Sequence, residues 1–321
     1  MKLFVTGGAG FIGSNYVRWV LHNRPDAEIT NYDLLTYAGN LANLRDLEDD
    51  KRYRFVKGDI CDPALLDEVV PGHDAILNFA AESHVDRSID WAAEFVRTNV
   101  LGTNTLLDAA RRHDIPRYLQ VSTDETYGSI DVGSFSEEDR LDPSSPYSAS
   151  KAGGDLLARA YHRTYGMPVV ITRGSNTFGP YQFPEKVIPL FVTNLLEDKT
   201  VPLYGDGMNV RDWIYVEDVA AGIHTVLEKG DVGQIYNIAA GNEWTNIDLT
   251  KAICDLLWKP HALITPVADR PGHDRRYSVD TSRTNALGWK PRWSFDDALG
   301  ATVDWYRENR WWWEPLRSRE G

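Results

Sequence analysis

The sequence contains few cysteines, no long apolar run and no excess of positive charge. Cys61 and Cys254 are its only cysteines among 321 residues, and their spacing fits neither a disulfide framework nor a metal site. No stretch reaches the roughly 18 consecutive apolar residues of a membrane helix, and no leader pattern opens the chain. We therefore expect a soluble, mature protein that has no metal site and no membrane-spanning helix, in a reducing, cytoplasmic setting.

The overall charge is strongly negative. The formal net charge of −13 excludes the clustered lysine and arginine of a nucleic-acid-binding surface, so an anionic ligand must be held by a few placed cations. Hydrophobic residues make up 42% and charged residues 25%, which is ordinary for a globular enzyme and excludes collagen-like and disordered classes. The length allows one large domain with an attached lobe, or two domains.

Apolar strands alternate with amphipathic helices from the start of the chain. This rhythm predicts an α/β fold with a doubly wound parallel Rossmann sheet. The expected strands are 2–8, 27–33, 53–60, 74–83, 117–123, 168–174 and 234–241, and the expected helices are 14–24, 95–113 and 147–166. Gly166 can end the last of these helices. Segments 179–207 and 258–291 are rich in proline, glycine and aromatics, and they predict a smaller, mixed lobe.

Three consecutive tryptophans, Trp311 to Trp313, stand near the C-terminus. Large aromatic side chains are mostly buried, so we expect this segment to pack on the body of the protein or on a partner subunit.

The stretch TGGAGFIGS, Thr6 to Ser14, follows an expected strand and opens an expected helix. Glycines in this context allow a tight turn and close approach to a pyrophosphate at a helix N-terminus. Asp33 ends the next strand, 20 residues after Gly13, where a carboxylate binds ribose hydroxyls and repels a 2′-phosphate. The pattern predicts NAD rather than NADP. Asp59, after the third strand, either meets the adenine or is an ordinary residue at a strand end.

Two further stretches carry candidate catalytic groups. Tyr147 and Lys151 in PYSASK are four residues apart, on one helix face, where an ammonium can lower the pKa of a phenol toward the working range of a base. In STDETYG two adjacent carboxylates, Asp124 and Glu125, follow Thr123 at the end of an apolar run. They are either an acid–base pair or incidental acids on a solvated turn.

These motifs together resemble the extended short-chain dehydrogenase/reductase superfamily, whose members act on nucleotide-linked sugars. Within it, longer strings are similar to the 4,6-dehydratase branch that acts on dTDP-glucose, up to about Tyr277; they are LLTYAGN, AAESHVDRSI, STDETYGSI, GPYQFPEKVIPLF, VPLYGDG, VRDWIYVEDV and DRPGHDRRY. The chain departs from the branch's usual pattern at Thr126, where valine is common, and at Thr177 and Phe178. We expect these changes to alter the chemistry little.

The resemblance implies an NAD-dependent hydro-lyase that oxidises the sugar at C4, eliminates water across C5 and C6 and returns hydride to C6, giving dTDP-4-keto-6-deoxyglucose. It implies Tyr147 as the base at the 4-hydroxyl, assisted by Thr123 and Lys151, with Glu125 as the base at C5 and Asp124 as the acid at the departing 6-hydroxyl. Asp124 and Glu125 would then work in unlike protonation states.

The resemblance also assigns binding residues. NAD is expected at Gly7, Gly10, Phe11, Ile12, Gly13, Asp33, Thr36, Asp59, Ile60, Ala80, Ala81, Ser83, Thr98, Tyr147 and Lys151. The nucleotide-diphosphate sugar is expected at His84, Arg87, Thr123, Asn176, Glu185, Lys186, Val187, Pro202, Tyr204, Arg211, Asn246, Asp269, His273 and Tyr277. We assign 1–178, with parts of 208–245, to an NAD-binding domain, and mainly 179–207 and 246–321 to a nucleotide-sugar-binding lobe.

Other functions share part of this pattern. A UDP-glucose 4,6-dehydratase or a nucleotide-sugar C4 epimerase would also use Thr123, Tyr147 and Lys151, and thymine differs from uracil by one methyl group. A non-catalytic NAD-sensing protein would need neither Asp124 nor Glu125. The resemblance further implies a homodimer formed by helices that flank the helix of Tyr147.

Overall fold

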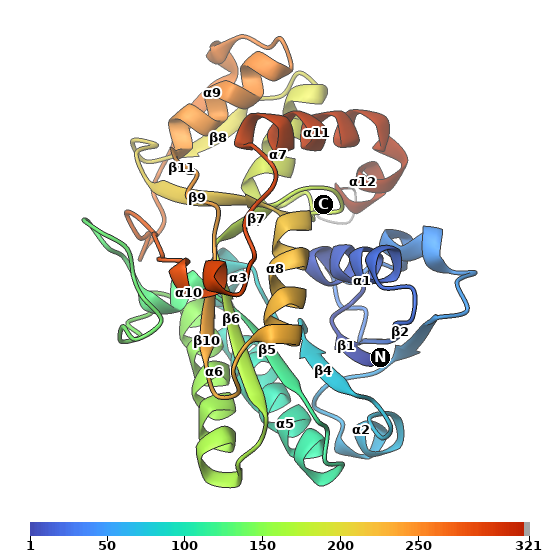
Figure 1. Cartoon of the computed structure of the whole chain (residues 1–321). Coiled ribbons are helices and arrows are strands. Elements are labelled where there is room, and N and C mark those ends of the chain that lie inside the picture. Colours follow the sequence, from blue (N-terminus) through green and yellow to red (C-terminus); the bar gives the residue numbers. More distant parts are fainter. Residues whose placement is uncertain (318–321) are drawn as a thin grey trace.

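The computed structural model describes residues 1–317, and their centre is a seven-stranded sheet in which all neighbouring strands are parallel (Figure 1). Its strands are β1 Lys2–Thr6, β2 Glu28–Asp33, β3 Tyr53–Lys57, β4 Ala75–Asn78, β5 Tyr118–Thr123, β6 Val169–Gly174 and β10 Ile235–Ile238. The order β10-β6-β5-β4-β1-β2-β3 reverses between β1 and β4, the point at which such sheets bind ligands. The predicted doubly wound sheet is confirmed.

Helices cover both faces of this sheet. One apolar core joins the sheet to α1 (Phe11–Asn23) and α8 (Val216–Lys229), which lie side by side. A second core joins the opposite face to α2 (Pro63–Val69), α5 (Thr103–Arg112) and α6 (Pro146–Tyr165). The shorter elements around the sheet are η1 Leu41–Leu47, α3 Val85–Asp90, α4 Ala92–Phe95, η2 Val96–Gly102, η3 Asp124–Tyr127 and α10 Ser282–Ala286.

Local sequence signals define the ends of α6. Ser145 and Ser148 form a capping box at its start, with Pro146 in the first turn. Gly166 ends the helix in the left-handed conformation, with φ of 67°, which glycine adopts without a steric penalty. The predicted stop at Gly166 is confirmed.

The expected helix 95–113 is not uniform. Within it, η2 is a π-helical segment that leads into α5. A Cβ on Gly102 at its end would lie 2.6 Å from the side chain of Ile60, so glycine allows close packing there. π-Helical turns are rare and occur often at functional sites. Thr98, predicted to contact NAD, lies on this segment.

A smaller lobe lies beyond the carboxyl ends of the sheet strands, at the top of Figure 1. Within the described chain it holds a three-stranded sheet, β11-β9-β7, and a two-stranded sheet, β12-β8. Their bounds are β7 Asn176–Phe178, β8 Val201–Tyr204, β9 Val210–Tyr215, β11 Glu243–Thr245 and β12 Ile264–Val267. The helices of the lobe are α7 Val187–Leu196, α9 Asn246–Leu256, η4 His261–Leu263, α11 Phe295–Glu308 and α12 Arg310–Arg317.

The tryptophans of α12 join the core of this lobe. Trp312 and Trp313 are 3% and 0% exposed, whereas Trp311 is 50% exposed. Packing on the body is therefore confirmed for two of the three. Among residues 1–317, no helix is long and apolar enough to cross a membrane, and no group of three histidine, cysteine or acidic side chains is placed to hold a metal ion.

Candidate active site

The turn between β1 and α1 requires its glycines. Gly7 has a φ of +68°, and a Cβ there would lie 2.5 Å from the backbone nitrogen of Ala80, just after the end of the neighbouring strand β4. A Cβ on Gly13 would lie 2.2 Å from the carbonyl oxygen of Gly7. The turn therefore brings bare backbone against the N-terminus of α1, an arrangement that fits a pyrophosphate.

Asp33 lies at the end of β2, beside this turn. Its Oδ2 accepts a hydrogen bond from the backbone N–H of Ala9 at 2.9 Å, and its Oδ1 accepts one from Leu35 at 2.8 Å. Burial raises the pKa of Asp33, and these two backbone donors act against that rise. The bonds fix the carboxylate at the edge of the pocket, where it fits the ribose hydroxyls of NAD.

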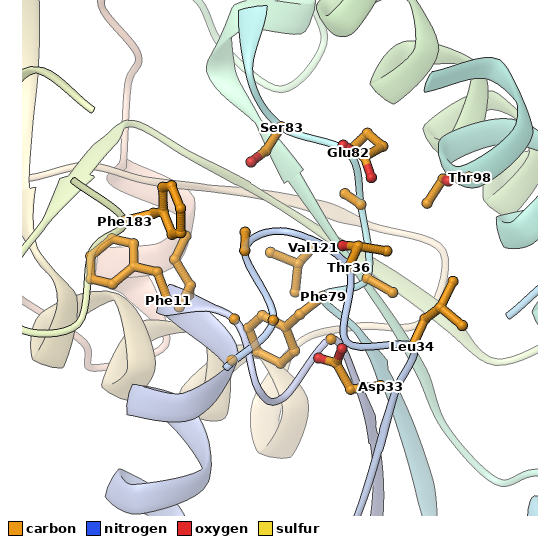
Figure 2. A pocket seen from close by; sticks show the side chains of 18 of the residues that line it. Phe11, Asp33, Leu34, Thr36, Phe79, Glu82, Ser83, Thr98, Val121 and Phe183 are labelled. Atoms are coloured by element: carbon orange, nitrogen blue, oxygen red, sulfur yellow. The ribbon is translucent and has the colours of Figure 1, made fainter. Parts of the chain in front are cut away.

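One pocket runs along the carboxyl ends of the central strands (Figure 2). All the residues predicted to bind NAD line it, together with Glu185 and Lys186 from the substrate set. Figure 2 shows Phe11 and Phe183 close together on one side of the pocket and Thr98 on the other. The glycine cradle, the acid at the end of β2 and this continuous lining fit NAD.

The pocket has lining residues that the sequence did not predict. Tyr181, Gln182 and Phe183 come from the string GPYQFPEK, and Trp312 comes from α12. The first three lie inside a string that was quoted for its family resemblance, so the resemblance could have indicated them. Nothing in the local pattern around Trp312 indicated that the C-terminal helix reaches the cofactor pocket.

The stretch STDETYG ends β5 and continues as the 3-10 turn η3. Thr123 caps this turn, since its Oγ1 accepts a hydrogen bond from the backbone N–H of Glu125 at 3.3 Å. The hydroxyl of Thr126 donates to the carbonyl of Thr123 at 2.8 Å, a bond that valine, common in the related pattern, cannot make. Asp124 is 3% exposed and its Oδ1 accepts from the Thr123 hydroxyl at 3.3 Å. The two acids therefore do not lie on a solvated turn.

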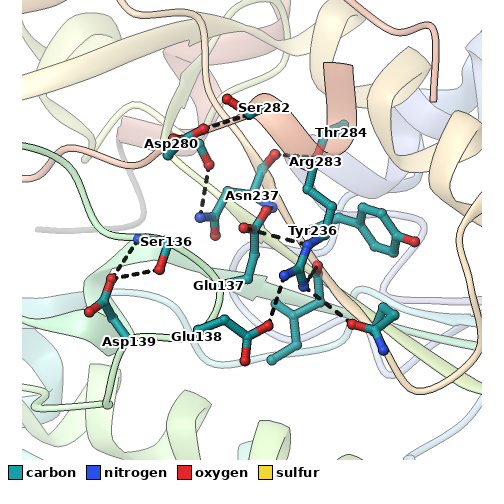
Figure 3. A network of polar contacts seen from close by, with 12 residues as sticks. Ser136, Glu137, Glu138, Asp139, Tyr236, Asn237, Asp280, Ser282, Arg283 and Thr284 are labelled. Atoms are coloured by element: carbon teal, nitrogen blue, oxygen red, sulfur yellow. Dashed lines mark hydrogen bonds and ion pairs between the residues drawn. The ribbon is translucent and has the colours of Figure 1, made fainter. Parts of the chain in front are cut away.

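A polar network supports this turn from behind. The hydroxyl of Tyr127 donates to Oδ1 of Asn237 on β10 at 2.9 Å. The backbone N–H of Asn237 donates to Oε1 of Glu137, and its side-chain amide donates to the carbonyl of Asp280 (Figure 3). The carbonyl of Asn237 accepts from the hydroxyl of Thr284. Segments far apart in the sequence thus converge on one buried asparagine and hold η3 against the sheet.

Tyr147 and Lys151 lie on α6 beside this turn. Nζ of Lys151 donates to the carbonyl of Val121 on β5 at 2.7 Å. The hydroxyl of Ser150 donates to the carbonyl of Tyr147 and accepts from the amide of Asn99 at 2.8 Å, which joins α6 to η2. The first turns of α6 are thereby fixed relative to both β5 and the π-helical segment.

The two carboxylates of η3 differ in their electrostatic surroundings. Burial raises the pKa of Asp124 well above its usual value, and Glu125 raises it further. Burial also raises the pKa of Glu125. Three cations, Arg211, Arg270 and Lys186, act against that second rise. The surroundings therefore favour protonation of Asp124 over protonation of Glu125.

The direction of the Tyr147 pKa shift differs from the expectation based on the sequence. Burial raises the pKa of Tyr147 well above its ordinary value, Glu125 raises it further, and a hydrogen bond with Thr123 lowers it. Burial lowers the pKa of Lys151 to about 8. Lys151 was expected to lower the Tyr147 pKa, but burial and the nearby carboxylate dominate.

Two basic residues of the predicted substrate set lie beside Glu185, which lines the pocket. Arg87 pairs with Glu185 at 3.0 Å, and His84 lies 3.6 Å from the same carboxylate. Burial lowers the pKa of His84 to about 4, which keeps its imidazole neutral near pH 7. Lys186 donates to the carbonyl of Ser83 at 2.8 Å, so the segment before α7 is tied to the segment after β4.

Another group of predicted substrate residues surrounds Arg211 on β9. Arg211 is 5% exposed, lies over the ring of Tyr277 at 4.2 Å and donates to the carbonyl of Asp274 at 2.9 Å. The amide of Asn209 donates to that same carbonyl at 3.1 Å, and the carbonyl of Asn209 accepts from the backbone N–H of Asn246 at 3.0 Å. The structure therefore brings these residues together.

The remaining predicted substrate residues lie on the neighbouring lobe strands. Pro202 and Tyr204 are on β8, which pairs with β12, and Tyr204 contacts the ring of His273 edge-on at 6.2 Å. His273 bonds to Asp269 at 2.6 Å. The remaining two positions are Asn176, which opens β7, and Val187, which opens α7 and packs on the core of the lobe.

Arg270 is a functional candidate that the sequence analysis did not name. It lies within the DRPGH segment, opposes the rise in the Glu125 pKa and pairs with Asp86 on α3 at 3.0 Å. Its segment was predicted at the site, but only the fold shows that Arg270 faces Glu125 and α3.

Known proteins match this chain over nearly its whole length. The family described as GDP-mannose 4,6 dehydratase matches residues 4–302. A dTDP-glucose 4,6-dehydratase of Streptomyces niveus is 52% identical over 99% of this chain and 96% of that protein. The low-salt glycan biosynthesis protein Agl12 of Haloferax volcanii is 54% identical over 95% of this chain and 98% of that protein.

A solved structure extends the match to three dimensions. DesIV, a dTDP-glucose 4,6-dehydratase from Streptomyces venezuelae with NAD and TYD bound, superimposes with a TM-score of 0.97 at 56% identity. The alignment covers 98% of this chain and 100% of that one, so it includes both the sheet and the lobe. The chain therefore belongs to the GDP-mannose 4,6 dehydratase family and, within it, to the dTDP-glucose 4,6-dehydratases.

Proposed function

We propose that this protein is an NAD-dependent enzyme that removes water from dTDP-glucose and forms dTDP-4-keto-6-deoxyglucose. The observation that carries the proposal is the pair Asp124 and Glu125, held on one turn in surroundings that favour unlike protonation states. An elimination of water needs a base at one carbon and an acid at the oxygen attached to the next. The pair offers both groups beside Tyr147 and Lys151.

The residues around the sugar divide the proton transfers among them. NAD, when bound, accepts hydride from C4 and later returns it to C6, so it is not consumed. Tyr147 takes the proton of the 4-hydroxyl, and the Thr123 hydroxyl, which already lowers the Tyr147 pKa, stabilises the developing phenolate. Lys151 holds a positive charge against the end of β5, on the same face of α6 as Tyr147.

The carboxylates perform the elimination. A ketone at C4 acidifies the C5 proton, which the ionised Glu125 removes. Asp124 donates its proton to the 6-hydroxyl, which leaves as water. Glu125 then returns a proton to C5, and the proton taken by Tyr147 restores Asp124 before the next turnover. Each proton transfer of this kind contributes a factor of about 100 to 10,000 in rate.

The lobe supplies the contacts to the nucleotide. We assign the diphosphate to Arg211 and Arg87, because a guanidinium group can donate two hydrogen bonds to phosphate oxygens. We assign stacking on the base to the ring of Tyr204, which is 37% exposed. We favour thymine as that base because several relatives that are 52% identical to this chain are named dTDP-glucose 4,6-dehydratases.

We also propose a homodimer in the cytoplasm. Val96, Leu101 and Leu156 expose 54%, 53% and 54% of their surface on the neighbouring elements η2 and α6. A group of exposed apolar side chains on adjacent helices supports a subunit interface there. The two free cysteines, Cys61 and Cys254, support a reducing compartment.

A C4 epimerase is the main alternative, because it would share Thr123, Tyr147 and Lys151. It only removes and returns hydrogen at C4, so it has no use for a buried acid beside an ionised one. The surroundings of Asp124 and Glu125 therefore favour the dehydratase.

The test is incubation of the purified protein with dTDP-glucose and, separately, with UDP-glucose, without added reductant. We expect dTDP-glucose to lose the mass of one water and UDP-glucose to react more slowly. A Tyr147→Phe variant serves as the control and should form little product. Conversion to a C4 epimer of unchanged mass would overturn the proposal.

A further inference from the structure

The C-terminal helix α12 reaches the cofactor pocket through one tryptophan. Trp312 is 3% exposed, lines the pocket together with the glycine turn, and donates from Nε1 to Oδ1 of Asn43 at 2.8 Å. Asn43, which is 1% exposed, lies on η1, more than two hundred residues earlier in the chain. A residue of the lobe thus bonds directly to the cofactor-binding half.

Asn43 also forms a hydrogen bond to the glycine turn. Its Nδ2 donates to the carbonyl of Ala9 at 2.8 Å, and that carbonyl also accepts from the backbone N–H of Asn40 at 3.0 Å. The N–H of Ala9 donates to Asp33. Ala9 lies between Gly8 and Gly10, so the chain of bonds ends at the backbone expected to meet the pyrophosphate.

The chemistry of the two ends fixes how Asn43 is oriented. The indole N–H of Trp312 can only donate, and the carbonyl of Ala9 can only accept. Rotating the Asn43 amide by half a turn would place donor against donor and acceptor against acceptor. Trp312 and the Ala9 carbonyl together therefore fix which end of the Asn43 amide meets the turn.

A second contact joins α12 to the pocket wall. Tyr181, which has a φ of 67°, meets Trp312 edge-on at a ring distance of 5.7 Å, and Arg18 of α1 lies over the same ring at 4.7 Å. Positive φ is unfavourable for a tyrosine, so packing from both sides must hold it there. Tyr181 also lines the pocket.

We propose that Trp312 is a positioning residue for NAD: it orients Asn43, fixes the glycine turn, and so makes retention of the cofactor depend on the C-terminal helix of the lobe. The inference rests on the NAD binding of the proposed function. It deepens that function, because an enzyme that takes hydride from a sugar and later returns it must keep the same cofactor throughout one turnover.

The three tryptophans provide matched controls. Trp313 is 0% exposed and donates from Nε1 to the carbonyl of Tyr306 at 2.8 Å, so it loses an equivalent buried bond when replaced, but it does not line the pocket. Trp311 is 50% exposed and donates to Asn309. Trp312→Phe, Trp313→Phe and Trp311→Phe therefore separate an effect on the cofactor from an effect on the fold.

The experiment measures the NAD dissociation constant by calorimetry and the thermal midpoint of each full-length variant. We expect Trp312→Phe to weaken NAD binding about 5-fold, the loss of one hydrogen bond, and Trp313→Phe to change it less than about 2-fold at a similar loss of thermal stability. Asn43→Ala should weaken NAD binding as Trp312→Phe does, and combining the two should add little.

Equal NAD affinities of Trp312→Phe and Trp313→Phe would overturn the proposal, and so would additive effects of Trp312→Phe and Asn43→Ala. If Trp312→Phe does not fold, the comparison of Asn43→Ala with Trp313→Phe decides in the same way. The readout involves no sugar, so wild-type protein that binds NAD but leaves dTDP-glucose unchanged would contradict the proposed function alone.

Discussion

Asp124 and Glu125 are adjacent in the sequence, yet their electrostatic surroundings differ. Burial raises the pKa of Asp124, and the carboxylates of Glu125 and Asp212 raise it further. Burial also raises the pKa of Glu125, but Arg211, Arg270 and Lys186 act against that rise. The residues of STDETYG alone left open whether the pair carries chemistry, and family resemblance implied Asp124 as the acid and Glu125 as the base. The local pattern could not indicate this division, because the cations around Glu125 come from segments distant in the chain.

Replacing each acid by its amide tests this division. Glu125→Gln keeps size and polarity but cannot accept the C5 proton, and we expect product formation to fall by about 100- to 10,000-fold. Asp124→Asn should slow water loss while exchange of the C5 proton with solvent continues. Mass spectrometry of products and of C5 exchange checks both; rapid C5 exchange in Glu125→Gln would remove Glu125 from the mechanism.

We expect the acid limb of the pH–rate profile to report the protonation of Glu125. Burial raises its pKa above the ordinary 4.5, so the rate should fall as pH decreases through that raised value and the base becomes protonated. Arg211→Met removes a cation that holds this pKa down, and it should move the acid limb to higher pH. Arg275→Met, an exposed arginine paired with Asp206, is the control and should leave the limb in place. A limb that stays fixed in Arg211→Met would contradict this assignment.

At the scale of elements, α6 is tied to the sheet by a buried ion pair. Arg173 on β6 donates to Asp155 at 2.9 Å, with side chains 1% and 0% exposed. Arg173 also lies over the ring of Tyr127 at 4.6 Å, so the pair connects α6, β6 and the turn η3. The negative charge of Asp155, one turn after Lys151, opposes the fall in the Lys151 pKa.

Breaking this pair should destabilise the protein strongly. Asp155→Asn leaves the buried Arg173 charge without its counterion, which costs about 3–5 kcal/mol of unfolding free energy. Asp304→Asn, in an exposed pair with Arg307, should cost no more than about 1 kcal/mol. Urea unfolding of both variants measures the difference. If Asp155→Asn loses no more stability than Asp304→Asn, the pair does not hold α6 in place.

Sequence patterns predicted the elements where local signals were strong. The strand before Gly7, the acid at Asp33 and the stop at Gly166 all follow from residues close in the chain. The π-helical segment η2 was not predicted, because its apolar spacing resembles that of an ordinary helix and its geometry depends on packing against α6.

At the scale of the whole molecule, the lobe completes the site. Its strands β8 and β9 carry Tyr204 and Arg211, and its last helix brings Trp312 to the cofactor pocket. The sequence predicted a smaller lobe from segments rich in proline, glycine and aromatics, and family resemblance assigned expected substrate residues to it. The contact between Trp312 and Asn43 could not be predicted, because neither residue has a local pattern that indicates the other.

The proposed dimer makes a prediction at the same scale. Leu101→Glu combined with Leu156→Glu places charges on the exposed apolar surface of η2 and α6, and we expect it to convert dimers into monomers. Val132→Glu, at an apolar residue that is 87% exposed elsewhere, should leave the dimer intact. Sedimentation velocity distinguishes these outcomes, and a double variant that remains dimeric would place the interface on another surface.

We propose that one site oxidises the sugar, eliminates water through Asp124 and Glu125, and reduces the product. The reaction of dTDP-glucose in heavy water, with the product analysed by mass spectrometry and proton NMR, tests all three steps together. We expect a 4-keto-6-deoxy sugar that has lost one water and carries a solvent deuterium at C5. A C4 epimer of unchanged composition, with no deuterium at C5, would contradict it.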